Sequence, residues 1–385
     1  MSRKSVTVLC VESSEITALT GERGVNNTFV FQGMQTEKYD GFADGQFFDP
    51  AKLKEAVFAA LDGMELSCGG GTKEVFVGVP GEFVKVVNRR HLISFQRKRR
   101  VTSADIDLLY QKGSADGQSG EFICRGSVFF VTSDKRRSID PVGMISDSLE
   151  GYLSYFFADV RFCELFRNIL SEYGIRKVNF LPLSLAEALY LIPSEVRDEY
   201  AILLDVGYIS MTFSVVCGNG IVFQNAYSVG GGHVAAHIMD DCGISFEAAE
   251  AMLRKVNLSS RDDAESKLEY SGKSENYTLS LGEVKEKVKE GLDIVCEAVN
   301  HSLELCDDRN LEYKPILLTG GGITGIRGAR EHISGRLNKV VEIVTPKLPY
   351  YNKAAQSSLL SLLDMALRTK RERGFIRKLF YGIGG

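Results

Sequence analysis

The sequence predicts a duplicated α/β fold in which two similar lobes flank a cleft. Near the start, the apolar strand 5–10 is followed by a polar turn and a second strand, 16–20. Almost two hundred residues later, the segment 201–220 repeats this strand–turn–strand pattern. Runs of β-branched and apolar residues that end at glycine or polar turns are typical of such strands. Because the same unit opens each half, we expect two related lobes whose turns face each other.

The composition is typical of a soluble globular protein large enough for two or three domains. Of the 385 residues, 44% are hydrophobic and 25% are charged. The net charge of −4 argues against a general nucleic-acid binder. The opening segment does not resemble a secretory signal, and no apolar run is long enough to span a bilayer. The eight cysteines have no metal-ligand spacing, so we expect reduced thiols, a cytoplasmic setting and no metal site.

The element pattern divides the chain into four predicted parts. A helix at 49–62 begins with an Asp-Pro pair, in which Asp49 can cap the first turn. A module of mixed strands and one helix follows, and it carries the basic run 97–100, which is most often a solvated face. The predicted parts are the first-lobe core, an inserted α+β module, a second lobe with a smaller subdomain, and a terminal tail. They cover 1–81 with 161–200 and about 335–367; 82–160; 201–334 with a subdomain at about 240–310; and 368–385.

Glycine-rich turns mark candidate ligand sites in the second half. Gly320, Gly321 and Gly322 follow a strand at 315–319 and precede a predicted helix. Glycines let backbone approach a ligand, and a helix start offers amide donors to anions. Each triplet alone is equally well explained by tight packing of the turn. Together with Gly231, Gly232 and the Asp205-x-Gly207 turn, however, they indicate a nucleotide cleft.

The last eighteen residues combine apolar and basic side chains in a helical pattern. The apolar positions recur at three- and four-residue steps, and the flanking charges are almost all basic. This composition is typical of a helix in the headgroup layer of an anionic membrane, whereas a helix packed on the protein's own core is the alternative. The predicted membrane-binding residues are Arg371, Arg373, Phe375, Ile376, Arg377, Lys378, Leu379, Phe380 and Ile383.

The order of these pieces resembles the cell-division protein FtsA family, bacterial relatives of actin, over essentially the whole length. The motifs that carry the resemblance are Asp140 to Met144 (DPVGM), Leu181 to Leu189 (LPLSLAEAL), Asp205 to Gly207 (DVG), Val229 to Val234 (VGGGHV), Thr319 to Gly325 (TGGGITG) and the basic terminus. The resemblance implies an actin-like, ribonuclease-H-like two-lobed fold with duplicated core domains, an FtsA-type inserted module and a C-terminal amphipathic helix.

The resemblance also implies a function. The chain would be an adaptor that polymerises with itself on the anionic inner face of the cell membrane. It would tether filaments of the tubulin relative FtsZ there, at the division septum. Lys285, Lys287 and Lys289 are weak candidates for gripping the acidic tail of that partner, although alternation with acids is usually surface patterning.

The implied cofactor is ATP with magnesium, held by the glycine turns and by polar residues around them. Glu250 and Arg254 would contact ribose and base. The implied nucleotide-binding set is Ser13, Ser14, Asp205, Gly207, Ser210, Gly231, Gly232, Glu250, Arg254, Gly320, Gly321 and Gly322.

The first turn departs from this pattern. Cys10 replaces the acid that faces the metal, Glu12 replaces a glycine, and Glu15 replaces a cation. Carboxylates beside a triphosphate repel it, and loss of the acid weakens placement of magnesium.

Residues of the second turn and of strand 178–181 also argue against ATP hydrolysis. In the second turn, Tyr208 and Ile209 replace smaller residues, and Leu181 cannot orient an attacking water. We therefore expect weak or absent ATP hydrolysis and no catalytic residues, and nucleotide binding stays open.

Two other functions fit the same fold. One is a platform protein of a pilus or secretion system, similar to PilM, for which no amphipathic tail is expected. The other is a nucleotide-dependent phosphotransferase of the same superfamily, which would need an intact first turn.

Overall fold

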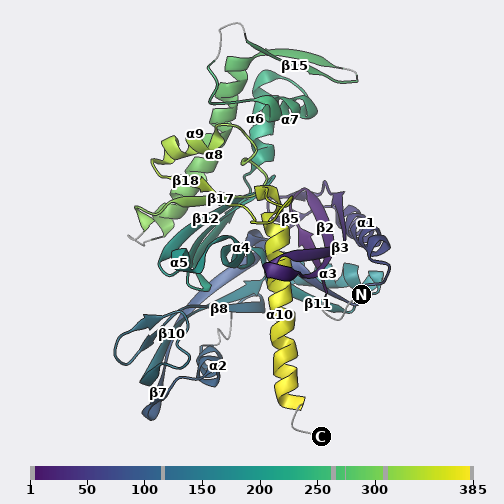
Figure 1. The fold of residues 1–385 in the computed structure, drawn as a ribbon. Helices are drawn as coiled ribbons and strands as arrows, with labels where there is room; N and C mark the ends of the chain where they lie inside the picture. Colours follow the sequence, from purple (N-terminus) through teal and green to yellow (C-terminus); the bar gives the residue numbers. More distant parts are fainter. Residues whose placement is uncertain (1–4, 114–117, 262–265, 274, 307–310, 382–385) are drawn as a thin grey trace. The chain divides into compact units, whose positions relative to one another are not determined.

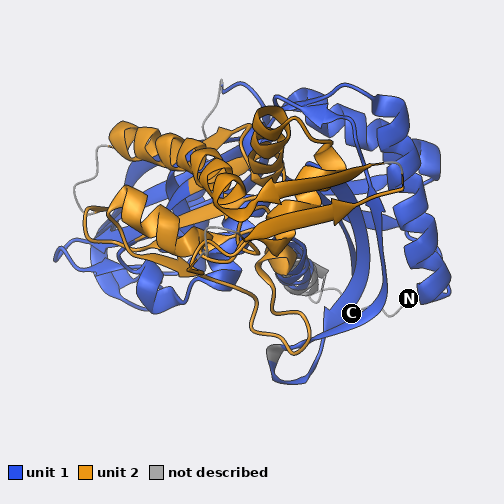
Figure 2. Ribbon diagram, turned by 90° about the horizontal axis from the view of Figure 1, so that it is seen from above, with its two compact units in different colours: residues 1–200, 214–224, 358–385 blue, residues 201–213, 225–357 orange. Residues whose placement is uncertain are grey.

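This computed structural model describes residues 5–113, 118–261, 266–273, 275–306 and 311–381, with only the backbone of Asn27 and of 372–381. The chain forms two compact units, coloured separately in Figure 2. Unit 1 comprises residues 1–200, 214–224 and 358–385, and unit 2 comprises 201–213 and 225–357. The four-part division predicted from the sequence is finer than these two units, and its boundaries stay predictions.

Unit 1 is built on a mixed five-stranded sheet in the order β11-β6-β1-β2-β3. Its strands are β1 (Val6–Val11), β2 (Glu15–Arg23), β3 (Phe29–Lys38), β6 (Glu74–Val79) and β11 (Lys177–Pro182). All six residues of β1 are buried, because β1 lies at the centre with β2 antiparallel on one side and β6 parallel on the other. Continuous apolar runs are typical of strands covered on both faces.

Helices and short strands complete this core. They are β4 (Phe42–Ala43), β5 (Gln46–Phe47), α1 (Pro50–Cys68), α3 (Val160–Tyr173), α4 (Leu183–Leu191), α5 (Ser194–Arg197) and α10 (Ser357–Tyr381). The predicted cap of α1 is present, since the Asp49 side chain accepts a hydrogen bond from the Lys52 amide at 3.1 Å. Pro50 stands at the first turn, where its missing amide hydrogen costs nothing.

A second sheet of unit 1 has the order β7-β10-β8-β9. Its elements are β7 (Val84–Arg100), α2 (Ser103–Lys112), β8 (Glu121–Thr132), β9 (Arg137–Ser138) and β10 (Ile145–Ala158), seen at the lower left of Figure 1. Its core includes Ile93, Leu109 and Leu153, so α2 contributes to a core shared with β7 and β10. Within the basic run, Arg99 pairs with Asp105 at 2.6 Å, whereas Arg97, Lys98 and Arg100 are exposed.

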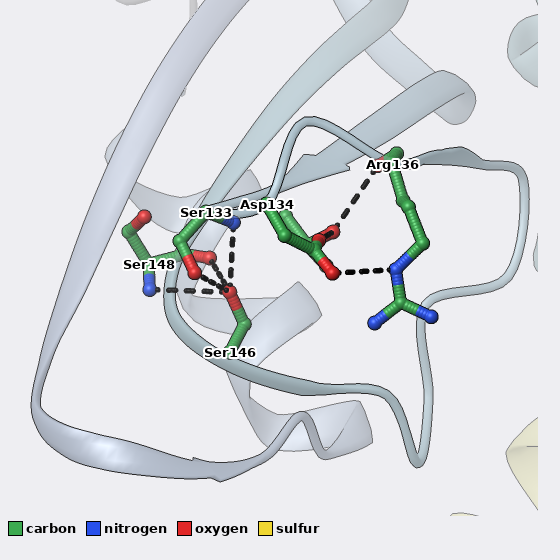
Figure 3. Close-up of polar contacts among 6 residues, drawn as sticks. Ser133, Asp134, Arg136, Ser146 and Ser148 are labelled. Atoms are coloured by element: carbon green, nitrogen blue, oxygen red, sulfur yellow. Dashed lines mark hydrogen bonds and ion pairs between the residues drawn. The ribbon is translucent and has the colours of Figure 1, made fainter.

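A buried serine organises the tip of this sheet (Figure 3). Ser146 is fully buried, and its Oγ accepts from the Ser133 amide at 2.9 Å and bonds to the Ser148 carbonyl at 2.6 Å. The strand register shifts between Ser146 and Ser148, which is a bulge. In the adjoining turn, Asp134 accepts from Arg136 Nε at 2.7 Å. The serine hydroxyl thus satisfies backbone groups that the bulge removes from the ladder.

The second five-stranded sheet of the chain has the order β14-β13-β12-β17-β18, and its residues 214–224 belong to unit 1. Its strands are β12 (Tyr200–Val206), β13 (Met211–Cys217), β14 (Gly220–Tyr227), β17 (Ile316–Thr319) and β18 (Val341–Ile343). β12 pairs parallel with β17, and β17 pairs parallel with β18. The remaining elements of unit 2 are α6 (Gly231–Cys242), α7 (Phe246–Lys255), β15 (Lys267–Ser271), β16 (Asn276–Ser280), α8 (Leu281–Leu305) and α9 (Ala329–Leu337).

The chain ends in one long helix, α10, drawn in yellow in Figure 1. Within unit 1, Asp364 of this helix is 4% exposed and pairs with Arg23 and with Arg368, each at 2.6 Å. Lys370 Nζ also donates to the Ser5 carbonyl at 2.7 Å. These bonds fix the first half of α10 on the first sheet. Among the described residues, no helix combines the length and apolar character needed to cross a bilayer.

Candidate functional site

Three glycine turns of unit 2 pack directly against one another. The Gly322 amide donates to the Val206 carbonyl at 2.8 Å, which ties the turn after β17 to the end of β12. A Cβ atom added to Gly322 would lie 1.9 Å from the Gly207 carbonyl oxygen, and one on Gly231 would lie 2.1 Å from the Gly322 oxygen. No side chain fits at either position. These glycines are therefore required for backbone packing, whatever else they contact.

The N-terminus of α6 is closed by the turn that follows β12. The amides of Gly231 and Gly232 donate to the carbonyls of Gly207 and Tyr208, at 3.1 and 2.6 Å. The His233 amide donates to the Gly230 carbonyl at 3.1 Å, and His233 Nδ1 accepts from the Gly230 amide at 3.2 Å. The His233 side chain therefore bonds within its own turn.

Asp205 stands at the end of β12 beside the glycine turns. Its Oδ1 is buried and has no hydrogen-bond partner among the described residues. A Cβ on Gly320 would lie 2.3 Å from this oxygen. Burial raises the pKa of Asp205 to about 6, because the ionised carboxylate loses hydration. A carboxylate in such surroundings is a candidate functional group, although structural sites also perturb pKa values.

Tyr208 reaches from this turn to α7. Its hydroxyl donates to Glu250 Oε1 at 2.8 Å, while Glu250 Oε2 accepts from Arg254 at 3.2 Å. The structure therefore brings together Asp205, Gly207, Ser210, Gly231, Gly232, Glu250 and the Gly320–Gly322 turn within unit 2. Arg254 is largely exposed at its edge. The sequence flagged the size of Tyr208 but did not predict its bond to Glu250, because residues 42 positions apart carry no pairing signal.

A helix follows the turn at Gly320 to Gly322, as the sequence predicts, but it does not begin at the turn itself. β17 ends at Thr319, and α9 begins only at Ala329. Gly320 has φ of +89°, which glycine adopts without strain, and Thr324 Oγ1 donates to its carbonyl at 2.5 Å. Without a helix start at this point, the turn offers no helix dipole to an anion.

The first turn lies in unit 1, between β1 and β2. The Glu12 amide donates to the Glu15 carbonyl at 3.0 Å, and the Tyr39 amide donates to the Ser14 carbonyl at 2.9 Å. Cys10 is buried in β1, and Ser13 is half-buried. The turn is thus closed by its own backbone, with two acidic residues at its ends. Leu181 of β11 is 4% exposed and serves the core.

The three lysines proposed for partner binding have internal acceptors. Lys285 is 3% exposed, and its Nζ donates to the carbonyl and hydroxyl of Ser260 at 2.9 and 2.8 Å. Lys289 pairs with Glu286 of the same helix at 2.6 Å. Lys285 is therefore not presented on the surface, because it anchors a loop.

Lys287 belongs to a cluster on α6 and α8. It pairs with Asp241 and Glu290, each at 2.9 Å, and His237 Nε2 lies 3.0 Å from Glu290. His237, Asp241 and Glu290 have the residue types of a metal site. The Lys287 ammonium, however, already lies between the two carboxylates, so a metal ion would have to displace it.

The predicted membrane-binding residues lie mostly outside the described side chains. The backbone of α10 continues to Tyr381, in agreement with a helical terminus. Arg371 is exposed. The side chains outside the described set are Arg373, Phe375, Ile376, Arg377, Lys378, Leu379, Phe380 and Ile383. Their role stays a prediction.

Comparisons with known proteins correct the family resemblance. The family model for the type IV pilus assembly protein PilM matches residues 181–361. No curated protein matches the chain. No FtsA family model matches either, so the FtsA resemblance was wrong. The FtsZ-type partner implied by it is withdrawn with it, because the match is to a pilus assembly protein.

Solved structures with a similar fold cover nearly the whole chain. The PilM–PilN type IV pilus biogenesis complex is 13% identical with a TM-score of 0.62, covering 94% of this chain and 98% of that one. MreB5 of Spiroplasma citri bound to ADP is 12% identical with a TM-score of 0.58, covering 97% and 99%. The ethanolamine utilization protein EutJ from Carboxydothermus hydrogenoformans is 12% identical with a TM-score of 0.54, covering 94% and 90%.

At these identities the likeness establishes the fold alone. The predicted fold class is confirmed, since the chain is a mixed α/β protein with the two-lobed architecture of actin-like ATPases. The fold does not establish the function, because proteins with one architecture can have unrelated activities.

Proposed function

We propose that this chain is a PilM-like component of a type IV pilus or related secretion machine. The observation that carries the proposal is the match of residues 181–361 to the PilM family model. The likeness to the PilM of the PilM–PilN complex over 94% of the chain supports it at the level of fold. A division-site function has no such support.

The proposed role is assembly, without phosphoryl transfer. Glu12 and Glu15 flank the first turn, and two carboxylates there oppose a triphosphate. Cys10 and Leu181 are buried core residues at the positions where acid and water-orienting groups were expected. A chain with these residues at the first turn can bind a partner through its surface without catalysing ATP hydrolysis.

We infer that the partner is a PilN-type protein, since PilN is named in the complex with the similar PilM. The test is isothermal titration of the full chain with the PilN-type protein encoded in the same genome. We expect saturable 1:1 binding. An FtsZ-type protein from the same genome serves as the matched control, with no heat of binding expected. Binding of the FtsZ-type protein alone would overturn the proposal.

We further propose a peripheral position at the cell membrane, supported by the basic and apolar composition of residues 371–385. Co-sedimentation with anionic vesicles, with and without these residues, tests this point. We expect the full chain to pellet and the truncated chain to stay in solution. Equal binding by both would contradict a membrane role for the terminus, and it would leave the pilus proposal to the titration above.

A further inference from the structure

The actin-like fold raises the question of whether unit 2 fits a nucleotide. MreB5 of Spiroplasma citri is described with bound ADP, so a nucleotide is the ligand that the fold implies. The contacts inside unit 2 answer the question for this chain, independently of the pilus proposal. An anion site needs unoccupied amide donors, and a sugar site needs unoccupied polar groups.

Four amides around the start of α6 already have protein acceptors. At the start of α6, the amides of Gly231, Gly232 and His233 donate to the carbonyls of Gly207, Tyr208 and Gly230. The Gly207 amide donates to the Ser210 carbonyl at 2.8 Å. To use these donors, a phosphate would have to break bonds within the turns, and each broken bond carries a desolvation cost.

The Tyr208 side chain lies over the same helix start. Its Cε1 is 3.2 Å from the position that a Cβ on Gly232 would take, so the ring passes closely over the first turn of α6. Its hydroxyl bonds to Glu250, the residue expected to contact a ribose. Since Arg254 takes the other carboxylate oxygen, both oxygens of Glu250 have partners within unit 2.

The buried carboxylate of Asp205 does not by itself make a nucleotide site. Its buried Oδ1 would suit a cation, but magnesium requires near-octahedral oxygen coordination and is usually held together with substrate phosphates. The neighbouring amides of Gly207, Gly231, Gly232 and His233 have acceptors within unit 2, as described above.

We propose that Tyr208 is a built-in occupant of the nucleotide half-site of unit 2. Its hydroxyl donates to the Glu250 carboxylate in place of a ribose hydroxyl, and its ring covers the start of α6. The chain therefore keeps the actin-like fold without needing ATP to fill this site.

The alternative is that Tyr208 is an ordinary packing residue that moves aside for ATP. The two differ in what happens when the side chain is removed. If Tyr208 excludes nucleotide, its removal creates binding. If it moves aside, removal changes affinity little, because the wild-type site already opens.

The test is titration of the full chain with fluorescent mant-ATP and magnesium. For the wild type we expect no saturable binding up to about 1 mM, whereas Tyr208→Gly binds at least about tenfold more tightly. Tyr313→Gly is the matched control, since Tyr313 is a 90% exposed tyrosine of the same unit. It is expected to behave as the wild type. Circular dichroism melts confirm that each variant is folded.

Two results would overturn the proposal. One is saturable micromolar binding of mant-ATP by the wild type. The other is a folded Tyr208→Gly variant that binds no better than the wild type. If Tyr208→Gly does not fold, Tyr208→Thr replaces it and is held to the same tenfold criterion. As an independent measurement, the wild-type chain is titrated with the PilN-type partner, with and without Mg-ATP. An affinity for the partner that changes with Mg-ATP counts against the proposal.

Discussion

Two aspartates with buried carboxylate oxygens, one in each unit, have opposite surroundings. Asp364 in α10 of unit 1 has arginine partners at both oxygens, Arg23 and Arg368. Asp205 at the end of β12 in unit 2 has a buried Oδ1 without a partner among the described residues. Burying an ionised carboxylate is costly unless it is paired. Asp364 therefore has a structural role. Burial of the Asp205 oxygen without a partner costs folding free energy, and such destabilising groups are typical of ligand-binding sites.

The largest effect on stability is expected from Gly320→Ala, which places a methyl group against the Asp205 carboxylate. The new Cβ would lie 2.3 Å from Asp205 Oδ1, and φ of +89° is strained for alanine. We expect a loss of about 2–5 kcal/mol in the free energy of unfolding, from backbone strain and overpacking together. Urea unfolding measures it. Gly325→Ala is the matched control, because a Cβ there meets no atom within 4 Å.

Arg23→Met tests the paired aspartate. It leaves the 4% exposed Asp364 with Arg368 as its only arginine partner in the described contacts. We expect a loss of about 2–4 kcal/mol, since the buried carboxylate loses one of its two arginine partners. Lys54→Met, which breaks the exposed pair with Glu172, should cost less than about 0.5 kcal/mol. Equal losses in the two variants would show that the Asp364 pair has no special role.

Asp205→Asn tests the unpaired aspartate and should have the opposite sign. Because burial raises the pKa of Asp205 to about 6, we expect the variant to be more stable at pH 7 by roughly 1–3 kcal/mol. The wild type loses stability as pH rises from about 4 to 6, since the folded state holds a proton there that the unfolded state has released. The advantage of the variant should therefore vanish below about pH 4. Urea unfolding at several pH values checks it, and an advantage that grows on acidification would contradict this assignment.

Tyr208→Phe should have the smallest effect. It removes the hydroxyl that bonds to Glu250 and keeps the ring over α6. We expect a loss of about 0.5–1.5 kcal/mol, the net contribution of a typical intramolecular hydrogen bond. Tyr313→Phe, at an exposed site, should change nothing measurable. Stability unchanged in Tyr208→Phe would mean that the bond to Glu250 contributes nothing net.

Much of the fold was predictable because its elements carry local signals. The repeated strand–turn–strand units are β1–β2 and β12–β13, and the Asp49 cap starts α1 as the Asp-Pro pair indicated. The family was wrong, since the quoted motifs are compatible with several relatives of one fold. The helix expected beyond the Gly320 to Gly322 turn is present as α9, but it begins only at Ala329, because these glycines form a packed turn and not the helix start.

The candidate site was only partly predictable. The sequence identified Asp205, the glycine turns and the unusual size of Tyr208. It did not reveal that Lys285 is buried against Ser260, because alternating charges are the same on a surface helix and on one that covers a loop. Nor did it reveal the arginine partners of Asp364, which lie on the same helix and on a strand more than three hundred residues away.

Local sequence signals were enough to establish the duplicated α/β architecture, the Asp49 cap of α1 and the acidic character of the first turn, since periodicity and residue type act over a few neighbours. Only the tertiary structure decided which polar groups have partners. In the folded unit, Tyr208 bonds to Glu250, and the first amides of α6 have carbonyl acceptors. Asp205 Oδ1 has no partner in the described part of the chain. The physical reason is that hydrogen bonding and burial depend on which distant segments meet, and that is settled by packing of the whole unit.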